Sequence, residues 1–185
     1  MIVFLVEEES MCVALRELLP KIFPDWKEKE DWRCIPHEGK ADLENSVPRK
    51  LRGWRTPGDR FVILRDQDES DCLDVKRHLV NLCKEADRPD ILIRIPCREL
   101  EAWFLGDLPA IARAYDAPSI IRKGGKKRFR DTDAVSRPSD VLYEWTGVRK
   151  KIDRARRIST QMDVDKNLSP SFNVFVSGLR AYVSG

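Results

Sequence analysis

The sequence predicts an α/β protein with a mostly parallel four-stranded sheet that helices cover on both faces. Short aliphatic runs alternate with amphipathic segments over the first hundred residues. The aliphatic runs show no polar alternation, which is typical of parallel strands that are buried on both faces. A chain of 185 residues that is 42% hydrophobic is also long enough for one ordinary domain with a sizeable core.

Four strands are expected in the first part of the chain. Their sequences are IVFLV, DWRCIP, FVIL and DILIRIP, at residues 2–6, 31–36, 61–64 and 90–96. Right-handed crossovers between parallel strands would place all four carboxyl ends at one edge of the sheet. Open α/β sheets bind their ligands at that edge.

Helical periodicity predicts the connecting segments, at residues 11–23, 41–54, 71–86 and 99–107. Ser10 is the expected N-cap of the first helix, and Ser70 or Asp71 that of the third. Pro48 is expected to bend or restart the second helix.

The distribution of charge indicates two parts with different roles. The net charge is +3, but residues 118–157 hold thirteen Lys or Arg against five Asp or Glu, a balance of +8 that leaves −5 for the rest. We interpret residues 1–107 as an α/β core and residues 108–185 as a basic, mostly helical extension packed on it. Within the extension, RKGGKKRFRDTD is expected to be a flexible basic segment.

The five cysteines are odd in number and scattered, without a Cys-x-x-Cys pair. This pattern favours neither a zinc site nor a disulfide framework, so we expect small buried apolar residues and a reducing cytoplasm. The N-terminus lacks a basic region before its apolar run, so a strand is expected there and not a signal peptide. No apolar run approaches the roughly 20 residues of a membrane helix.

Acidic residues follow all four predicted strands, which would bring them to the same edge of the sheet; they are Glu7, Glu8, Glu9, Glu38, Asp66, Asp68, Glu99 and Glu101. Carboxylates that close repel each other and raise each other's pKa unless a cation lies among them. Hard oxygen ligands suit Mg²⁺ or Mn²⁺, and the spacing of Asp66 and Asp68 lets both reach one ion. The alternative is structural, because acidic side chains also cap helices and stabilise their first turns.

Several segments resemble the Toprim-like proteins grouped as domain-of-unknown-function family 4276. They are IVFLVEEESM…LLPKIFP, IPHEGKADLENSVPRKLRGW, FVILRDQDESDC, IPCRELEAWFLGDL and the later ARRISTQMDVDKNLSPSFNVFVSGLR. The resemblance covers most of the chain, and ELEAWFLGD is its most specific part. It implies a Toprim/Rossmann-like fold and a relation to Toprim nucleases of the overcoming-lysogenization-defect type, which work with Mg²⁺.

The resemblance also implies roles for individual residues. Glu7 matches the Toprim glutamate that serves as general acid/base or metal ligand, and Asp66 and Asp68 match its metal-holding Asp-x-Asp. The chain departs from the common Glu-Gly-x-x-Glu motif, because Glu8 replaces the glycine and Met11 the second glutamate. The chain therefore lacks one carboxylate of the usual two-metal site, and Glu8, Glu9 and Glu101 are the candidates to supply it.

Other polar residues flank the acidic edge as candidates for supporting roles; they are Glu8, His37, Lys40, Arg65, Arg98 and Glu99. The cations could stabilise a phosphate in the transition state, or pair with the neighbouring carboxylates. His37 is interpreted either as a general acid or phosphate ligand, or as a hydrogen-bonded loop residue.

Together these features predict a divalent-metal-dependent nuclease acting on DNA or RNA, with Glu7, Asp66, Asp68 and Glu101 as catalytic residues. A nucleic-acid backbone would bind a mobile basic loop beside that edge, through Arg122, Lys123, Lys126, Lys127, Arg128 and Arg130, and Phe129 could stack on a base. The resemblance adds a role in bacterial defence. The sequence leaves open a protein partner or a homo-oligomer.

The main alternative is a nucleic-acid-binding or adaptor module whose Toprim-like catalytic centre has decayed. A receiver-like phosphoacceptor is a weaker alternative, because such a protein would need Ser or Thr after the fourth strand, where this chain has Arg98 and Glu99.

Overall fold

The computed structural model describes residues 1–185 except for the side chain of Arg128. Its centre is a four-stranded, all-parallel sheet with the strand order β2-β1-β3-β4, which confirms the predicted α/β class. The strands are β1 (Ile2–Val6), β2 (Trp32–Pro36), β3 (Arg60–Leu64) and β4 (Leu92–Arg94). Val6 pairs in register with Pro36 and Leu64, so three strands end at the same level.

Helices follow each strand and make up most of the second half; they are α1 (Glu9–Ile22), α2 (Lys40–Gly53), α3 (Cys72–Glu85), α4 (Glu101–Leu105), α5 (Leu108–Ala114), α6 (Ser119–Gly124), α7 (Pro138–Thr146), α8 (Lys151–Gln161) and α9 (Pro170–Ser184). Among the described residues, no helix combines the length and the apolar character needed to cross a bilayer. Asp71 caps α3, as expected, by accepting hydrogen bonds from the backbone N–H groups of Leu73 and Asp74.

Two details of the helices differ from expectation. The N-cap of α1 is Glu8, and Ser10 lies within the first turn, where its Oγ donates to Glu8 Oε1 at 2.6 Å. Helix α2 continues through Pro48 without restarting.

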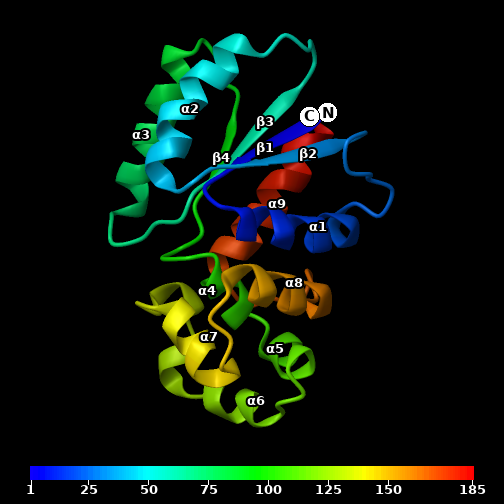
Figure 1. The fold of residues 1–185 in the computed structure, drawn as a ribbon, viewed down its shortest axis with the longest axis vertical. Helices are drawn as coiled ribbons and strands as arrows, with labels where there is room; N and C mark the ends of the chain where they lie inside the picture. Colours follow the sequence, from blue (N-terminus) through cyan, green and yellow to red (C-terminus); the bar gives the residue numbers. More distant parts are fainter.

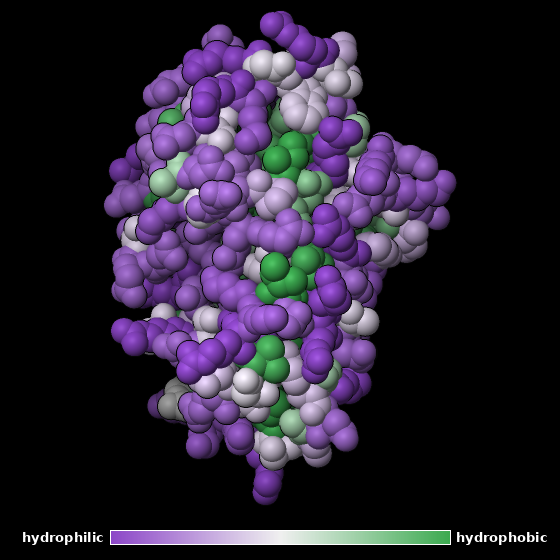
Figure 2. Space-filling model, in the orientation of Figure 1, coloured by the Kyte–Doolittle hydropathy of each residue, from purple (hydrophilic) through white to green (hydrophobic). Residues whose placement is uncertain are grey.

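Different helices cover the two faces of the sheet (Figure 1). On one face, Val3 and Leu5 of β1 belong to the same apolar cluster as Leu43 of α2 and Leu79 of α3. The outer surface over α2 and α3 is mostly hydrophilic (Figure 2). Helices α1 and α9 cover the other face, and the remaining helices extend beyond the sheet on that side, with α8 packed against α1 (Figure 1).

The core on the α1 and α9 face is one continuous cluster. It runs from Phe4 of β1 to Leu142 of α7 and Ile158 of α8. Trp103 of α4 lies within it, 1% exposed, and stacks on Phe175 of α9 with ring centroids 4.9 Å apart. Trp103 is therefore a core residue.

Cys12 of α1 and Cys34 of β2 form a disulfide bond with a Cα–Cα separation of 5.7 Å. The expectation that the cysteines form no disulfide was wrong for this pair, so the cysteines no longer support the prediction of a reducing cytoplasm. The spacing gives no sign of the bond, because it depends on how α1 packs against β2. Of the free cysteines, Cys83 is buried, and Cys72 and Cys97 are half-buried.

Candidate functional site

The carboxyl edge of the sheet brings Glu7 and Asp66 together. Because β1 and β3 are neighbours in register, the residues after them leave the sheet side by side. The Glu7 backbone N–H donates to the Leu64 carbonyl at 3.1 Å, and the Asp66 N–H donates to Glu7 Oε2 at 3.0 Å. The Glu7 carboxylate therefore lies against the start of the loop that follows β3.

Asp66 is buried, with 3% of its surface exposed. Its Oδ1 atom has no hydrogen-bond partner among the described residues. Burial raises the pKa of Asp66 well above its usual value, and the negative charges of Glu101 and Glu7 raise it further. A buried ionised carboxylate with an unsatisfied oxygen is costly, so Asp66 should either hold a proton or have a cation beside it.

Asp68 and Arg98 adopt left-handed backbone conformations, with φ of 56° and 63°, in the loops after β3 and β4. The Asp68 N–H donates to the Arg98 carbonyl at 2.8 Å, and the Arg98 guanidinium donates to the Asp68 carbonyl at 3.2 Å. Such conformations cost non-glycine residues free energy, so these mutual hydrogen bonds hold the two loops in place. The Asp68 carboxylate pairs with Lys40 at 3.0 Å.

Glu7 has a raised pKa, caused first by burial and then by the negative charge of Asp68. An acid with a raised pKa is better able to carry a proton near neutral pH than an exposed glutamate.

Glu101 is buried beside Asp66 and pairs with Arg154 of α8. The N–O distance is 2.8 Å, and both side chains are 2% exposed. Arg154 also donates to the carbonyl and the hydroxyl of Ser139. Burial raises the pKa of Glu101 although Lys151 and Arg154 oppose the rise, and its Oε2 has no hydrogen-bond partner among the described residues.

Lys151, the first residue of α8, reaches the same cluster. Its ammonium donates to both carboxylate oxygens of Glu8, at 3.1 and 3.3 Å. Burial alone would lower the pKa of Lys151, but the carboxylates of Glu101, Glu8 and Asp66 raise it. Lys151 therefore stays positively charged and is held in the site by Glu8.

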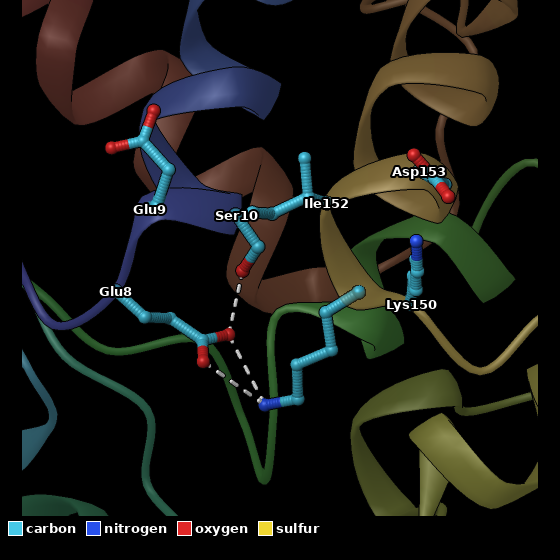
Figure 3. A pocket seen from close by; sticks show the side chains of 7 residues that line it. Glu8, Glu9, Ser10, Lys150, Ile152 and Asp153 are labelled. Atoms are coloured by element: carbon cyan, nitrogen blue, oxygen red, sulfur yellow. Dashed lines mark hydrogen bonds and ion pairs between the residues drawn. The ribbon is translucent and has the colours of Figure 1, made fainter.

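A pocket of about 570 Å³ opens beside Lys151, between the first turns of α1 and α8. Figure 3 shows Glu8 and Ser10 on the α1 wall of this pocket, and Lys150 and Asp153 on the α8 wall.

The flanking residues predicted for supporting roles are tied to neighbouring groups. Arg65 pairs with Glu44 at 3.1 Å and donates to the Asp66 carbonyl. Glu99 Oε2 accepts from the Ser139 N–H.

His37 is held by two hydrogen bonds. Its Nδ1 lies 2.8 Å from the Val6 carbonyl, and its Nε2 lies 3.0 Å from Lys50 Nζ. A carbonyl only accepts and an ammonium only donates, so Nδ1 carries the proton and the ring is neutral. Burial lowers the pKa of His37 in agreement with this state. The structure fits the interpretation of His37 as a hydrogen-bonded loop residue.

Within the part of the chain that the structure describes, no three or more Asp, Glu, His or Cys side chains are grouped so that they could hold a metal ion. Glu7, Asp66 and Asp68 are close enough to influence one another, but Asp68 turns to Lys40. Mg²⁺ is commonly held by one or two carboxylates together with water and substrate phosphate oxygens. Glu7 and Asp66, with the unsatisfied Asp66 Oδ1, fit that smaller donor set.

The basic segment of residues 122–130 is more ordered than predicted. Arg122 and Lys123 belong to α6, and Lys127–Phe129 forms a short 3-10 helix. Gly124 is buried against Leu108, and a Cβ at this position would clash with the Leu108 side chain. This glycine therefore permits close packing of the end of α6, and its presence here is not a sign of flexibility.

Most of the predicted phosphate-binding side chains of this segment are exposed; these are Arg122, Lys123, Lys126, Lys127 and Arg130. The side chain of Arg128 lies outside the described residues. Phe129 is only 6% exposed and packs edge-to-face on Trp145, so the expectation that it stacks on a base was wrong. Helix α6 lies at the end of the molecule remote from the sheet (Figure 1), and not beside the carboxylates as expected.

The sequence interpretation missed Lys151 and Arg154 as parts of the acidic site. They lie 143 residues from Glu8 and 53 residues from Glu101 along the chain, respectively. Their i, i+3 spacing in VRKKIDRARR was a usable signal, because it places both cations on one face of a helix.

The fold and the site define an α/β protein with a carboxylate cluster at the carboxyl edge of a parallel sheet. Two cations from α8, Lys151 and Arg154, form ion pairs with this cluster. The chain belongs to the family described as Domain of unknown function (DUF4276), whose family model matches residues 6–180. Neither a search of curated proteins nor a search of solved structures returned a match.

Proposed function

We propose that this protein is a divalent-metal-dependent nuclease, which hydrolyses phosphodiester bonds in DNA or RNA. The observation that carries the proposal is Asp66, a buried carboxylate beside Glu7 whose Oδ1 has no hydrogen-bond partner among the described residues. A divalent cation would satisfy this oxygen and offset the burial and the repulsion between carboxylates that raise the pKa of both carboxyls. The location supports the proposal, because parallel α/β sheets bind ligands at this edge.

Asp66 and Glu7 would hold Mg²⁺ or Mn²⁺, and Asp68 would join them if it left Lys40. When bound, the ion would polarise the scissile phosphate and lower the pKa of a water nucleophile. Glu7 has a second suitable property, because burial and the negative charge of Asp68 raise its pKa, which makes it a better proton acceptor than an exposed glutamate. Glu101, held by Arg154, would contribute negative charge beside Asp66.

A nucleic-acid substrate is supported by the exposed cations of the extension and by the resemblance to Toprim nucleases. Phosphate contacts from Lys and Arg need no base recognition, so binding through residues 122–130 would depend strongly on salt. Because α6 lies away from the carboxylates, a bound strand would have to extend along the helical part of the molecule to reach both.

Cleavage assays with Mn²⁺ on single- and double-stranded DNA and RNA test this function. Wild type should cut at least one substrate, Asp66→Ala should not, and Glu7→Gln should lose about 10²–10⁴-fold in rate, as expected for the loss of a general acid or base. Glu9→Gln is the matched control, because Glu9 follows the same strand but pairs with Arg16 at the surface. Equal degradation by wild type, Asp66→Ala and Glu7→Gln would indicate a contaminant and end the proposal.

A specific observation favours the second candidate, a nucleic-acid-binding or adaptor module with a decayed centre. Glu8 and Asp68 are neutralised by Lys151 and Lys40 within the chain, so part of the cluster needs no metal. In that case no substrate would be cut, and replacing basic residues such as Lys126 and Lys127 would still weaken DNA or RNA binding.

A further inference from the structure

The charges of the cluster are only partly balanced by the chain itself. Three cations pair with its carboxylates at 2.8 to 3.1 Å. At the border, Arg65 is paired with Glu44, and Arg98 and Glu99 cancel in charge. The cluster proper contains five carboxylates and three cations, namely Glu7, Glu8, Asp66, Asp68 and Glu101 with Lys40, Lys151 and Arg154. If all are ionised, two negative charges remain, which is the charge that one divalent ion would neutralise.

The uncompensated charge is localised. Glu8, Glu101 and Asp68 each have an ion-pair partner. Glu7 accepts a backbone N–H from Asp66 and forms no ion pair among the described residues, although Arg65 lies near enough to interact with its charge. Asp66 is 97% buried and keeps Oδ1 unsatisfied among the described residues. Among the described residues, Glu7 and Asp66 are therefore the two carboxylates of the cluster that form no ion pair, and they are adjacent.

Lys151 occupies the other side of the cluster. Its ammonium donates to both oxygens of Glu8 and interacts electrostatically with Glu101 and Asp66, so it supplies positive charge to three carboxylates of the cluster. A positive charge at the start of a helix is unfavourable because it lies at the positive end of the helix dipole, and the carboxylates of the cluster offset this cost for Lys151.

We propose that the site binds one divalent ion, at Glu7 and Asp66, and that Lys151 is its built-in second cation. This inference rests on the proposed function, and it specifies how the site handles charge. Lys151 repels the ion but removes the need for a second one, so a substrate phosphate would lie between one metal and one ammonium. Arg154 has a supporting role, because it neutralises Glu101 from the buried side.

Isothermal titration with Mn²⁺ alone, in the absence of nucleic acid, tests the inference. Wild type should bind one ion per chain at this site, and Asp66→Asn should lose it. Lys151→Met removes the ammonium while keeping the length of the side chain. This variant should bind the ion at least about tenfold more tightly, or take up a second ion, because a repelling charge has been removed.

Two further variants keep the result interpretable. Lys151→Arg retains the positive charge, so its affinity for Mn²⁺ should stay closer to that of wild type than the affinity of Lys151→Met does. Lys150→Met changes an exposed neighbour in the same pocket and should leave binding unchanged. If Lys151→Met does not fold, Lys151→Gln is titrated in its place. Two ions in wild type, none in wild type, or unchanged binding in the folded Lys151 variants would overturn the inference.

The titration separates this inference from the proposed function. One ion with the expected Lys151 effect but no cleavage of any substrate would leave the charge arrangement standing and remove the nuclease. Cleavage by a protein that takes up two ions would support the nuclease and overturn the proposed charge arrangement.

Discussion

Replacing Arg154 by Met should strongly destabilise the protein. The guanidinium pairs with Glu101 at 2.8 Å, and each side chain is 2% exposed, so water and salt screen the pair very little. Arg154 also donates to two oxygens of Ser139, which connects α8 to α7. Methionine can fill much of the space but cannot replace the charge.

The expected loss follows from the charge that stays behind. Removing one partner of a buried ion pair costs roughly 3–5 kcal/mol, because the other charge remains desolvated and uncompensated. Here that charge is Glu101, whose pKa burial already raises. Without Arg154 the pKa of Glu101 should rise further. The loss should therefore be largest well above the new pKa and should shrink as the pH falls and Glu101 becomes neutral.

Urea unfolding followed by circular dichroism measures the effect, at about pH 8 and again at about pH 5. Arg156→Met, at an exposed position of the same helix, should stay within about 0.5 kcal/mol of wild type. Adding Glu101→Leu to Arg154→Met should recover much of the loss, since an apolar pair can replace a buried ion pair. A loss below about 1 kcal/mol that does not change with pH would refute this reasoning.

Three other outcomes are expected. Asp66→Asn should stabilise the metal-free protein at neutral pH, because the raised pKa of Asp66 makes its ionised form costly in the folded state above pH 3.8. In urea unfolding, the gain in stability should vanish as the pH falls towards 3.8, and a gain that does not change with pH would contradict this cause. Lys21→Met should cost about 1–2 kcal/mol in the same assay, since the ammonium donates to three carbonyls at the C-terminal end of α8, at 2.7, 2.7 and 2.9 Å. Reductant should lower the free energy of unfolding by about 3 kcal/mol, since the Cys12–Cys34 bond closes a loop with a sequence separation of 22. The stability of a Cys12→Ala/Cys34→Ala variant should not change with reductant, and an unchanged stability of wild type would contradict the bond.

The sheet edge could be predicted because its position follows from the periodicity of the sequence and the handedness of the connections. Once β1 and β3 are parallel, the residues after Val6 and Leu64 must emerge together, and this brought Glu7 and Asp66 to the same place. Patterns of this kind depend on local sequence and on the handedness of connections, both of which are visible in a single chain.

The balance of charge within the site could not be predicted in this way. Lys151 and Arg154 reach their partners across long separations in the sequence, and the basic residues around them give no sign that either pairs with a buried carboxylate. Phe129 shows the same limit, because it lies among six charged residues yet packs on Trp145. Ser10 was mistaken for a cap because the acidic run before it gave no sign that α1 begins at Glu9.

The central claim is that Glu7 and Asp66 bind a divalent cation, and thermal unfolding with and without Mn²⁺ tests it most directly. At a free concentration of about 100 times its dissociation constant, the ion should add about 2.7 kcal/mol of stability and raise the melting temperature of wild type. Asp66→Ala and Glu7→Gln should gain little or nothing, while Glu9→Gln should respond like wild type. A wild type whose melting temperature does not change with Mn²⁺, or a shift that persists in Asp66→Ala, would contradict the account.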